Sequence, residues 1–297
     1  MVVKGIITAL VTPLNSDGTL CENCLKELIE FQAKNGIQGL YLTGTAGEGI
    51  ILPLDVRVKV FEKALEYAPK NMYLLPHVGA ANIDEVLYLA KHAKDLGYRD
   101  ISVIGPIFHK PSRKGLIKYF EYIASKSELN IIVYNNTGRQ GYNISPEDFQ
   151  TITEVTSSVK GIKDTSRDIS QLLEYVKKFS SKYFIAGAGD EFLFYTFVIG
   201  AHAHVCAVSN VVPELVLKLY KNIVEGRLQE ALDIQYKLTQ LRKIIAKMTS
   251  EAQEGIREFL KLRGLNPGYP PIQMVHEFDS KLIEEAKRLL NTILFEG

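Results

Sequence analysis

Eight short apolar segments recur along the chain as far as Ala207, and this repetition constrains the fold more than any other feature. They are rich in β-branched residues, and a stretch with apolar side chains three or four residues apart, typical of an amphipathic helix, follows each. Strands that alternate with helices pair in parallel, and eight of them favour a closed (β/α)8 barrel, the TIM barrel, over an open sheet. The eight segments are Gly5–Thr12, Gly39–Thr43, Met72–Val78, Asp100–Ile104, Asn130–Tyr134, Val159–Lys163, Tyr183–Ala186 and Ala203–Ala207.

The chain continues well beyond the eighth predicted strand. Helical sequence runs from Pro213 to about Leu262, a turn rich in Gly and Pro spans 264–271, and a last helix follows. We expect residues 1–212 to form the barrel. Residues 213–297 should supply the last barrel helix and a C-terminal helical extension, packed as one unit with the barrel.

Composition limits the kinds of partner. Apolar residues make up 46% of the chain and charged residues 23%, which is enough to bury a sizeable core. The formal net charge is +1 and no long run of Lys and Arg occurs, so nothing indicates nucleic acid or a membrane surface. We also find no membrane span and no signal peptide. A small-molecule partner and a cytoplasmic location are expected.

Cysteines and histidines offer little sign of a metal site. Cys21, Cys24 and Cys206 form an odd, low count that is typical of a reducing compartment. The CxxC of the first two could serve redox or metal chemistry, but no second Cys/His pair has zinc spacing. His202 and His204 fall at the start of a strand, the structural end of a barrel. We expect no metal.

Chemistry in an α/β barrel takes place where the strands end. The sixth predicted strand ends in Lys163, whose burial would lower its pKa and free a nucleophilic amine. Local sequence alone favours a lysine that reaches water. Tyr134 ends the fifth strand, where a phenol can move protons beside such an amine; considered alone, it is a packing tyrosine whose hydroxyl finds some partner.

Two further loops follow predicted strands. Thr43–Gly49 is rich in glycine, and its N–H groups can converge on an anion, or it is an ordinary turn. No Gly-Lys-Ser/Thr follows it, so it is not a nucleotide P-loop. After the seventh strand, Asp190 and Glu191 could accept hydrogen bonds from substrate hydroxyls, or they could cap the next helix.

In this order, these strand ends resemble the dihydrodipicolinate synthase and N-acetylneuraminate lyase family of class I, Schiff-base-forming barrels. The resemblance covers nearly the whole chain. Its most specific motifs are Gly44-Thr45-Ala46-Gly47-Glu48, Tyr134-Asn135 and Gly161-Ile162-Lys163-Asp164-Thr165.

The resemblance implies roles for several side chains. Lys163 would carry the imine, Tyr134 would shuttle protons, and Thr45 would act with them at the carboxylate of a 2-oxo acid. No metal or organic cofactor would be needed, and the assembly would be a homotetramer. The substrate-binding residues would be Thr45, Ala46, Gly47, Arg139, Thr165, Asp190, Glu191 and Val205.

The chain departs from the family pattern at three places. Ala46 replaces the second hydroxyl of the carboxylate loop. Phe108 stands where the synthases have a tyrosine that reaches across from a neighbouring subunit into the proton relay. Asn136-Thr137-Gly138 replaces a stretch that often contains a proline.

These features leave several functions open. Arg139 has the spacing of the arginine that holds the aldehyde carboxylate in the synthases, whereas Phe108, Thr165 and the Asp190-Glu191 pair favour a 2-keto-3-deoxy sugar acid aldolase. We expect the aldolase and keep the synthase as the alternative. A dehydratase or hydratase with the same imine, or a catalytically silent binding protein or regulator, are further alternatives. The basic residues Lys110, Arg113 and Lys114 could hold a distal phosphate, or they form a solvated loop.

Overall fold

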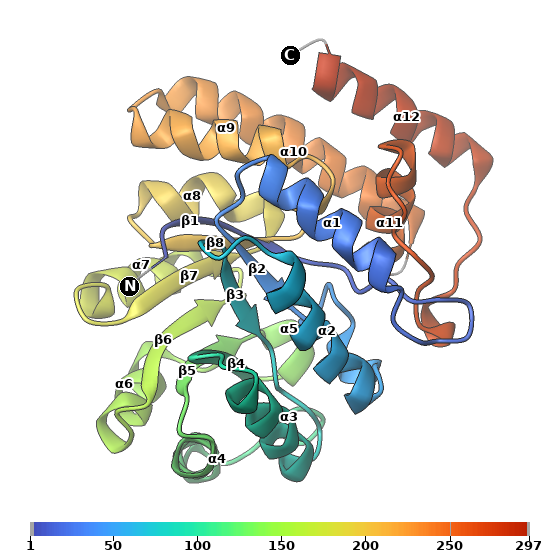
Figure 1. Cartoon of the computed structure of the whole chain (residues 1–297). Helices are drawn as coiled ribbons and strands as arrows, with labels where there is room; N and C mark the ends of the chain where they lie inside the picture. The colour runs from blue at the N-terminus through green and yellow to red at the C-terminus, as the bar shows by residue number, and fades with distance from the viewer. Residues whose placement is uncertain (1–2, 250, 296–297) are drawn as a thin grey trace.

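Eight parallel strands form the centre of the computed structural model, which describes residues 3–249 and 251–295. Their order in the sheet is β3-β2-β1-β8-β7-β6-β5-β4 (Figure 1). All eight predicted strands are present, although the first ends at Ala9 rather than Thr12 and the seventh continues to Ala188. The strands are β1 (Gly5–Ala9), β2 (Gly39–Leu42), β3 (Tyr73–Pro76), β4 (Asp100–Ile104), β5 (Asn130–Asn135), β6 (Val159–Asp164), β7 (Phe184–Ala188) and β8 (Ala203–Cys206).

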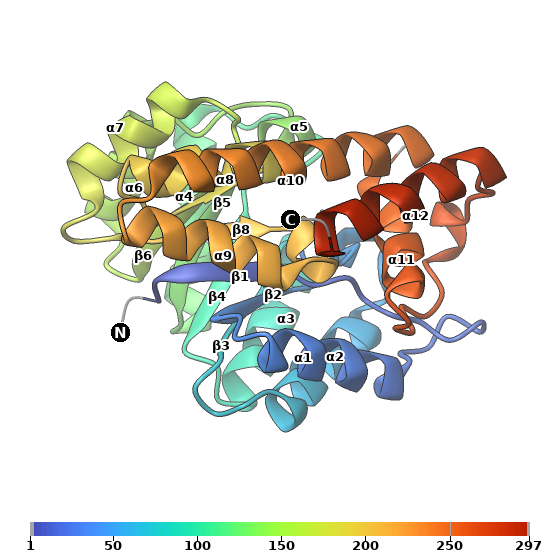
Figure 2. The ribbon, with the colours of Figure 1, turned by 90° about the horizontal axis from the view of Figure 1, so that it is seen from above.

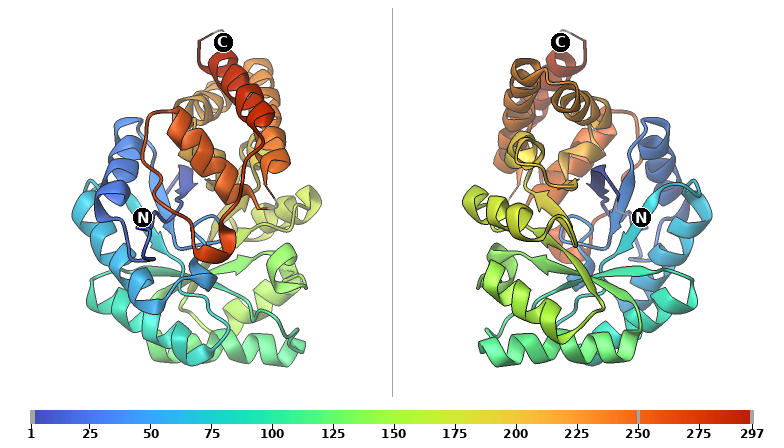
Figure 3. Two further views of the ribbon diagram at one scale, coloured as in Figure 1. Left: turned by 90° about the vertical axis from the view of Figure 1, so that its right-hand side faces the viewer. Right: turned by 90° about the vertical axis from the view of Figure 1, so that its left-hand side faces the viewer.

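The sheet closes between β3 and β4. The join is a parallel bridge between His77 and Ser102, and the Val78 N–H donates to the Ser102 carbonyl at 2.9 Å. Helices surround the strands, as the two views along the barrel show (Figure 3). The predicted (β/α)8 barrel is therefore confirmed. Its helices are α1 (Glu22–Lys34), α2 (Leu54–Tyr67), α3 (Ile83–Asp95), α4 (Arg113–Ser127), α5 (Thr137–Gln140), α6 (Pro146–Val155), α7 (Ile169–Phe179), α8 (Leu193–Val198) and α9 (Pro213–Val224), with short 3₁₀ turns η1 (Gly49–Ile51), η2 (Asp190–Phe192) and η3 (Val208–Asn210).

Two apolar clusters stabilise the barrel. The larger lies between the strands and the outer helices. The smaller fills the barrel interior, because alternate side chains of each strand point inward. The interior cluster includes Ile7, Tyr41, Leu75, Ile132, Tyr134, Phe184, Ala186 and Val205. Two tyrosine hydroxyls, those of Tyr41 and Tyr134, therefore lie inside a cluster of otherwise apolar side chains.

The C-terminal extension contains α10 (Leu228–Met248), α11 (Ala252–Leu262), η4 (Ile272–Met274) and α12 (Ser280–Phe295). The sequence from Pro213 to Leu262 forms three helices, and the break after α9 falls at Gly226, whose φ of 78° is accessible to glycine without strain. Helix α10 runs beside α9, and α12 packs on α10 (Figure 2). This arrangement brings α10 and α11 to the barrel mouth.

None of the described helices combines the length and the apolar character that crossing a bilayer requires.

Candidate active site

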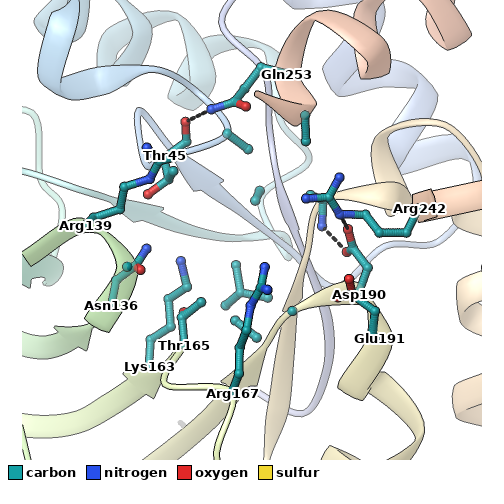
Figure 4. Close-up of a pocket in the computed structure, with 18 of the residues that line it drawn as sticks. Thr45, Asn136, Arg139, Lys163, Thr165, Arg167, Asp190, Glu191, Arg242 and Gln253 are labelled. Atoms are coloured by element: carbon teal, nitrogen blue, oxygen red, sulfur yellow. Dashed lines mark hydrogen bonds and ion pairs between the residues drawn. The ribbon is translucent and has the colours of Figure 1, made fainter. Parts of the chain in front are cut away.

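A cavity of about 420 Å³ opens at the carboxyl ends of the strands. Strands β1, β5, β6, β7 and β8, the loop after β2, and helices α10 and α11 all contribute to it. Figure 4 shows the cavity with several of its side chains. The predicted residues that line it are Thr45, Ala46, Tyr134, Arg139, Lys163, Thr165, Asp190, Glu191 and Val205.

Lys163 lies at the base of this cavity, and only 4% of its surface is exposed. Its Nζ atom is 3.7 Å from the centre of the Tyr134 ring and 3.9 Å from the centre of the Tyr41 ring. Burial lowers the pKa of the amine below its ordinary value of 10.5, although the nearby Tyr134 opposes this shift. Lys163 is thus a buried amine held between two aromatic rings, and it loses its proton more readily than a lysine in water.

Tyr134 faces the same cavity from the neighbouring strand, since β5 and β6 pair it directly with Lys163. Its hydroxyl lies 3.1 Å from the Thr45 hydroxyl and accepts a hydrogen bond from the Asn136 side-chain amide at 2.7 Å. Burial would raise the pKa of this phenol. The charge of Lys163 and the hydrogen bonds from Thr45 and Asn136 outweigh burial, so that the pKa of Tyr134 is lowered. The phenol is therefore suited to release and take up a proton.

Two buried aromatic residues beneath the cavity were not predicted from the sequence. The Tyr41 ring faces Lys163, and its hydroxyl pairs with that of Ser102 at 2.9 Å. The His77 ring meets Tyr134 edge-on at 5.6 Å between ring centres. Burial lowers the pKa of His77 well below 6.5, so that this imidazole is neutral. Both residues belong to strands or strand ends with apolar patterns, which gave no sign of a functional role.

Thr45, Ala46 and Gly47 lie in the loop after β2. Their three backbone N–H groups make no hydrogen bond to a backbone carbonyl within residues 3–249 and 251–295. Successive free N–H groups of this kind can bind an anion. Gly47 itself is outside the cavity lining. A Cβ atom there would lie 2.8 Å from the Leu10 carbonyl oxygen, so glycine allows the loop to pass close to the end of β1.

Helix α11 holds this loop in place. The Gln253 side chain donates to the Thr45 carbonyl at 2.8 Å. The Arg257 guanidinium pairs with the Glu48 carboxylate through two hydrogen bonds, one of 2.7 Å, and also donates to the Thr12 carbonyl at 2.9 Å. Both Glu48 and Arg257 are buried. Sequence reasoning missed this clamp because its partners are about two hundred residues apart in the chain.

The acidic pair after β7 divides into two environments. Asp190 is buried, and one carboxylate oxygen accepts from the backbone N–H groups of Ala207 and Val208 at 2.8 and 3.1 Å. The other oxygen lies 3.5 Å from Arg242 Nε. Burial raises the pKa of Asp190, although Arg242 and these N–H groups oppose it. Asp190 thus connects the ends of β7 and β8, whereas Glu191 faces the cavity.

Two other predicted residues also line the cavity. Arg139 forms a two-pronged ion pair with Glu251, in which Nη1 donates at 2.9 Å. Thr165 has a buried hydroxyl without a hydrogen-bond partner in the described part of the chain. A hydroxyl of this kind can serve a ligand.

The basic residues considered for a distal phosphate lie elsewhere. Arg113 and Lys114 begin α4 on the outer surface, and Arg113 Nε donates to Asp148 at 2.8 Å. Neither they nor Lys110 contributes to the cavity at the barrel mouth. The cationic side chains that do line it, besides Lys163, are Arg139, Arg167 and Arg242.

The cysteines and histidines are not among the residues that line this cavity. Cys21 and Cys24 form a disulfide at the start of α1, a pairing not predicted from the low cysteine count, and Cys206 is free and buried. His204 Nδ1 lies 2.9 Å from the Thr196 hydroxyl. Among the described residues, no group of three or more His, Cys, Asp or Glu side chains is placed to hold a metal ion.

Comparisons with known proteins identify the family. Residues 2–291 match the family model described as the dihydrodipicolinate synthetase family. The chain is 30% identical over 245 residues to a 4-hydroxy-tetrahydrodipicolinate synthase of Thermotoga petrophila, covering 82% of this chain and 83% of the relative. It is 31% identical over 291 residues to an N-acetylneuraminate lyase of Fusobacterium nucleatum, covering 97% and 98% of the two chains.

Solved structures show the same likeness. YagE, a prophage protein of the dihydrodipicolinic acid synthase family from E. coli K12, crystallised in complex with pyruvate, matches with a TM-score of 0.91 at 26% identity and covers 98% of both chains. The crystal structure of N-acetylneuraminate lyase from Fusobacterium nucleatum matches with a TM-score of 0.90 at 29% identity, covering 98% of this chain and 99% of the other. The chain thus belongs to the dihydrodipicolinate synthetase family and is a class I lyase of that family.

Proposed function

We propose that this protein is an aldolase that cleaves 2-keto-3-deoxy sugar acids to pyruvate and an aldehyde through an imine on Lys163. The observation that carries the proposal is the placement of the buried Lys163 amine against Tyr134, whose hydroxyl is held by Thr45 and Asn136. A lowered lysine pKa supplies the nucleophile, and a lowered tyrosine pKa supplies the proton carrier.

The reaction follows from these two groups. Neutral Lys163 attacks the keto carbon, and the resulting carbinolamine loses water to give an iminium ion. Tyr134 then takes the proton of the C4 hydroxyl as the C3–C4 bond breaks, and the bonding electron pair moves into the iminium. The aldehyde leaves. The enamine is protonated at C3 and hydrolysed, which releases pyruvate and restores the amine.

The loop after β2 is suited to the substrate carboxylate. The free N–H groups of Thr45 and Ala46, which line the cavity, would donate to it, while the Thr45 hydroxyl stays paired with Tyr134. Ala46 supplies an N–H group but no hydroxyl, so one hydrogen bond fewer is made than with two hydroxyl-bearing residues. The clamp from Gln253 and Arg257 keeps this loop in one conformation before substrate arrives.

A specific observation favours the aldolase over a dihydrodipicolinate synthase. The synthase would need Arg139 to hold the carboxylate of its aldehyde substrate, but both terminal nitrogens of Arg139 already bind Glu251. Phe108 also lacks the hydroxyl that a relay from a neighbouring subunit would use. The synthase remains the second candidate, because Arg139 does line the cavity and the relative from Thermotoga petrophila carries that name.

A substrate panel tests the proposal. The protein is incubated with several 2-keto-3-deoxy sugar acids, and separately with pyruvate and aspartate semialdehyde, and all products are identified. We expect pyruvate from the sugar acids and none from the Lys163→Ala variant. The Lys160→Ala variant is the matched control, since Lys160 lies exposed on the same strand. Products that have lost water but kept all carbons would indicate a dehydratase, and condensation with the semialdehyde alone would indicate the synthase.

Binding without any turnover would instead support a catalytically silent binding protein or regulator. Thermal stabilisation by the sugar acids that is unchanged in Lys163→Ala would be its signature. Such a result would contradict the aldolase proposal.

A homotetramer is part of the same proposal. Phe108 follows β4 in the chain, is 91% exposed and has a left-handed φ of 69°. An exposed aromatic side chain at this position is available for a contact between copies of the chain. Light scattering coupled to size exclusion should give four copies, and Phe108→Asp should reduce that number. A monomer at micromolar concentration would contradict this part.

A further inference from the structure

Arg167 is a cation in the cavity that the imine chemistry does not use. It follows β6 in the loop before α7, is exposed, and has a left-handed φ of 65°. This conformation is uncommon for a residue other than glycine. Its guanidinium points into the cavity and forms no ion pair with any carboxylate among the described residues (Figure 4).

Arg242 reaches the same cavity from α10. Its Nε lies 3.5 Å from Asp190, whereas its Nη1 is buried and has no hydrogen-bond partner in residues 3–249 and 251–295. The Asp190 carboxylate is shared between this arginine and two backbone N–H groups. A buried N–H donor without a partner is costly unless a ligand completes it.

These two arginines lie away from the loop proposed to hold the substrate carboxylate. In Figure 4 Thr45 and Arg139 lie on one side of the cavity, and Arg167, Asp190 and Arg242 lie on the other. A substrate with its carboxylate at Thr45 and its carbonyl at Lys163 would therefore extend toward the arginines. A three-carbon acid would leave most of the cavity of about 420 Å³ empty.

We propose that Arg167 and Arg242 bind an anionic group at the far end of the substrate chain, either a phosphate ester or a second carboxylate. This inference rests on the proposed function, because the direction of the chain is set by the imine at Lys163. Glu191 also lines the cavity and would repel a misplaced anion. It is suited to accept a hydrogen bond from a hydroxyl between the two ends. The ligand is then a polyhydroxy 2-oxo acid with a charged terminus.

Binding to the Lys163→Ala variant tests this site without any imine chemistry. Calorimetry measures three ligands, namely 2-keto-3-deoxygluconate, its 6-phosphate, and 2-keto-3-deoxyglucarate, which ends in a carboxylate. At least one anionic ligand should bind about tenfold more tightly than the neutral-ended acid, as expected for charge-assisted hydrogen bonds. Comparing the two anionic ligands identifies whether phosphate or carboxylate is preferred.

Further variants assign that preference to the two arginines. In the Lys163→Ala background, Arg167→Ala should reduce the preference for the anionic ligand to less than about threefold, and Arg167→Lys should restore part of that preference. Arg242→Gln should act in the same direction, and its thermal unfolding shows whether the loss of the Asp190 partner has altered the fold. Lys114→Ala is the matched control on the outer surface and should keep the full preference.

Two results would overturn the inference. One is equal affinity for all three ligands, and the other is a preference that survives Arg167→Ala. Either result leaves the aldolase proposal untouched if the wild type still releases pyruvate. Loss of pyruvate release with the anionic preference intact would instead overturn the aldolase and leave the anion site standing.

Discussion

The buried ion pair between Glu48 and Arg257 gives the sharpest stability prediction. Only 1% of the Glu48 side chain and 3% of the Arg257 side chain are exposed, and the guanidinium makes two hydrogen bonds to the carboxylate. Glu48→Gln keeps the size but leaves a buried cation without its counterion. Breaking such a pair from one side costs about 3–5 kcal/mol of folding free energy.

A third charged group, Glu254, determines where in that range of folding free energy the loss should fall. Burial raises the pKa of Glu254, and the nearby Glu48 raises it further. Once Glu48 is neutral, the pKa of Glu254 falls and its carboxylate can partly compensate Arg257. We therefore expect a loss near the lower limit, about 3 kcal/mol.

Urea unfolding followed by circular dichroism measures this loss. Asp95→Asn is the matched control, since it breaks the exposed pair with Lys91 and should leave stability unchanged within error. The double variant Glu48→Gln with Arg257→Met removes both charges and should lose clearly less than the sum of the single variants. A loss below about 1 kcal/mol in Glu48→Gln, or strict additivity in the double variant, would show that this ion pair does not stabilise the fold as expected.

Three further predictions concern the chemistry. Tyr134→Phe should lower turnover by about 10²–10⁴-fold while pyruvate still forms an imine, and steady-state rates unaffected by this change would exclude Tyr134 as the proton carrier. The amine of Lys163 must lose its proton to react, and its pKa is lowered, so activity should rise with pH through a value below 10.5. Between that value and 10.5 only the unfolded state holds the proton, so the free energy of unfolding in urea should also rise with pH, and Lys163→Met should abolish this rise. Ala46→Ser should lower the KM for 2-oxo acids by adding a hydroxyl to the loop, and an unchanged or higher KM would place the carboxylate elsewhere.

The strands were predictable because those of a parallel barrel are covered on both faces and read as continuous apolar runs. The same reasoning placed Lys163 and Tyr134 at strand ends, and their pairing across β5 and β6 brings them together. The ends of the segments were less accurate. Gly187 and Ala188 continue β7, although the sequence suggests a turn there.

The parts of the cavity that the sequence did not predict come from long-range packing. Arg242, Gln253 and Arg257 belong to helices whose patterns show only which face is buried, and nothing in those patterns points to the barrel mouth. Arg167 follows the Lys163 motif closely in sequence, yet a charged residue in a loop is usually solvated. The sequence predicted equally well that Asp190 binds substrate hydroxyls or that it caps the next helix. In the structure its carboxylate accepts hydrogen bonds from the backbone N–H groups of Ala207 and Val208, a role that neither prediction included.

Trapping the imine on Lys163 tests the proposed chemistry most directly. The protein is mixed with pyruvate and borohydride, and intact mass and peptide mapping then locate the adduct. We expect one reduced pyruvate per chain on Lys163, the same adduct in Lys160→Ala, and none in Lys163→Ala. No adduct with pyruvate or a longer 2-oxo acid, or an adduct on another lysine, would contradict it.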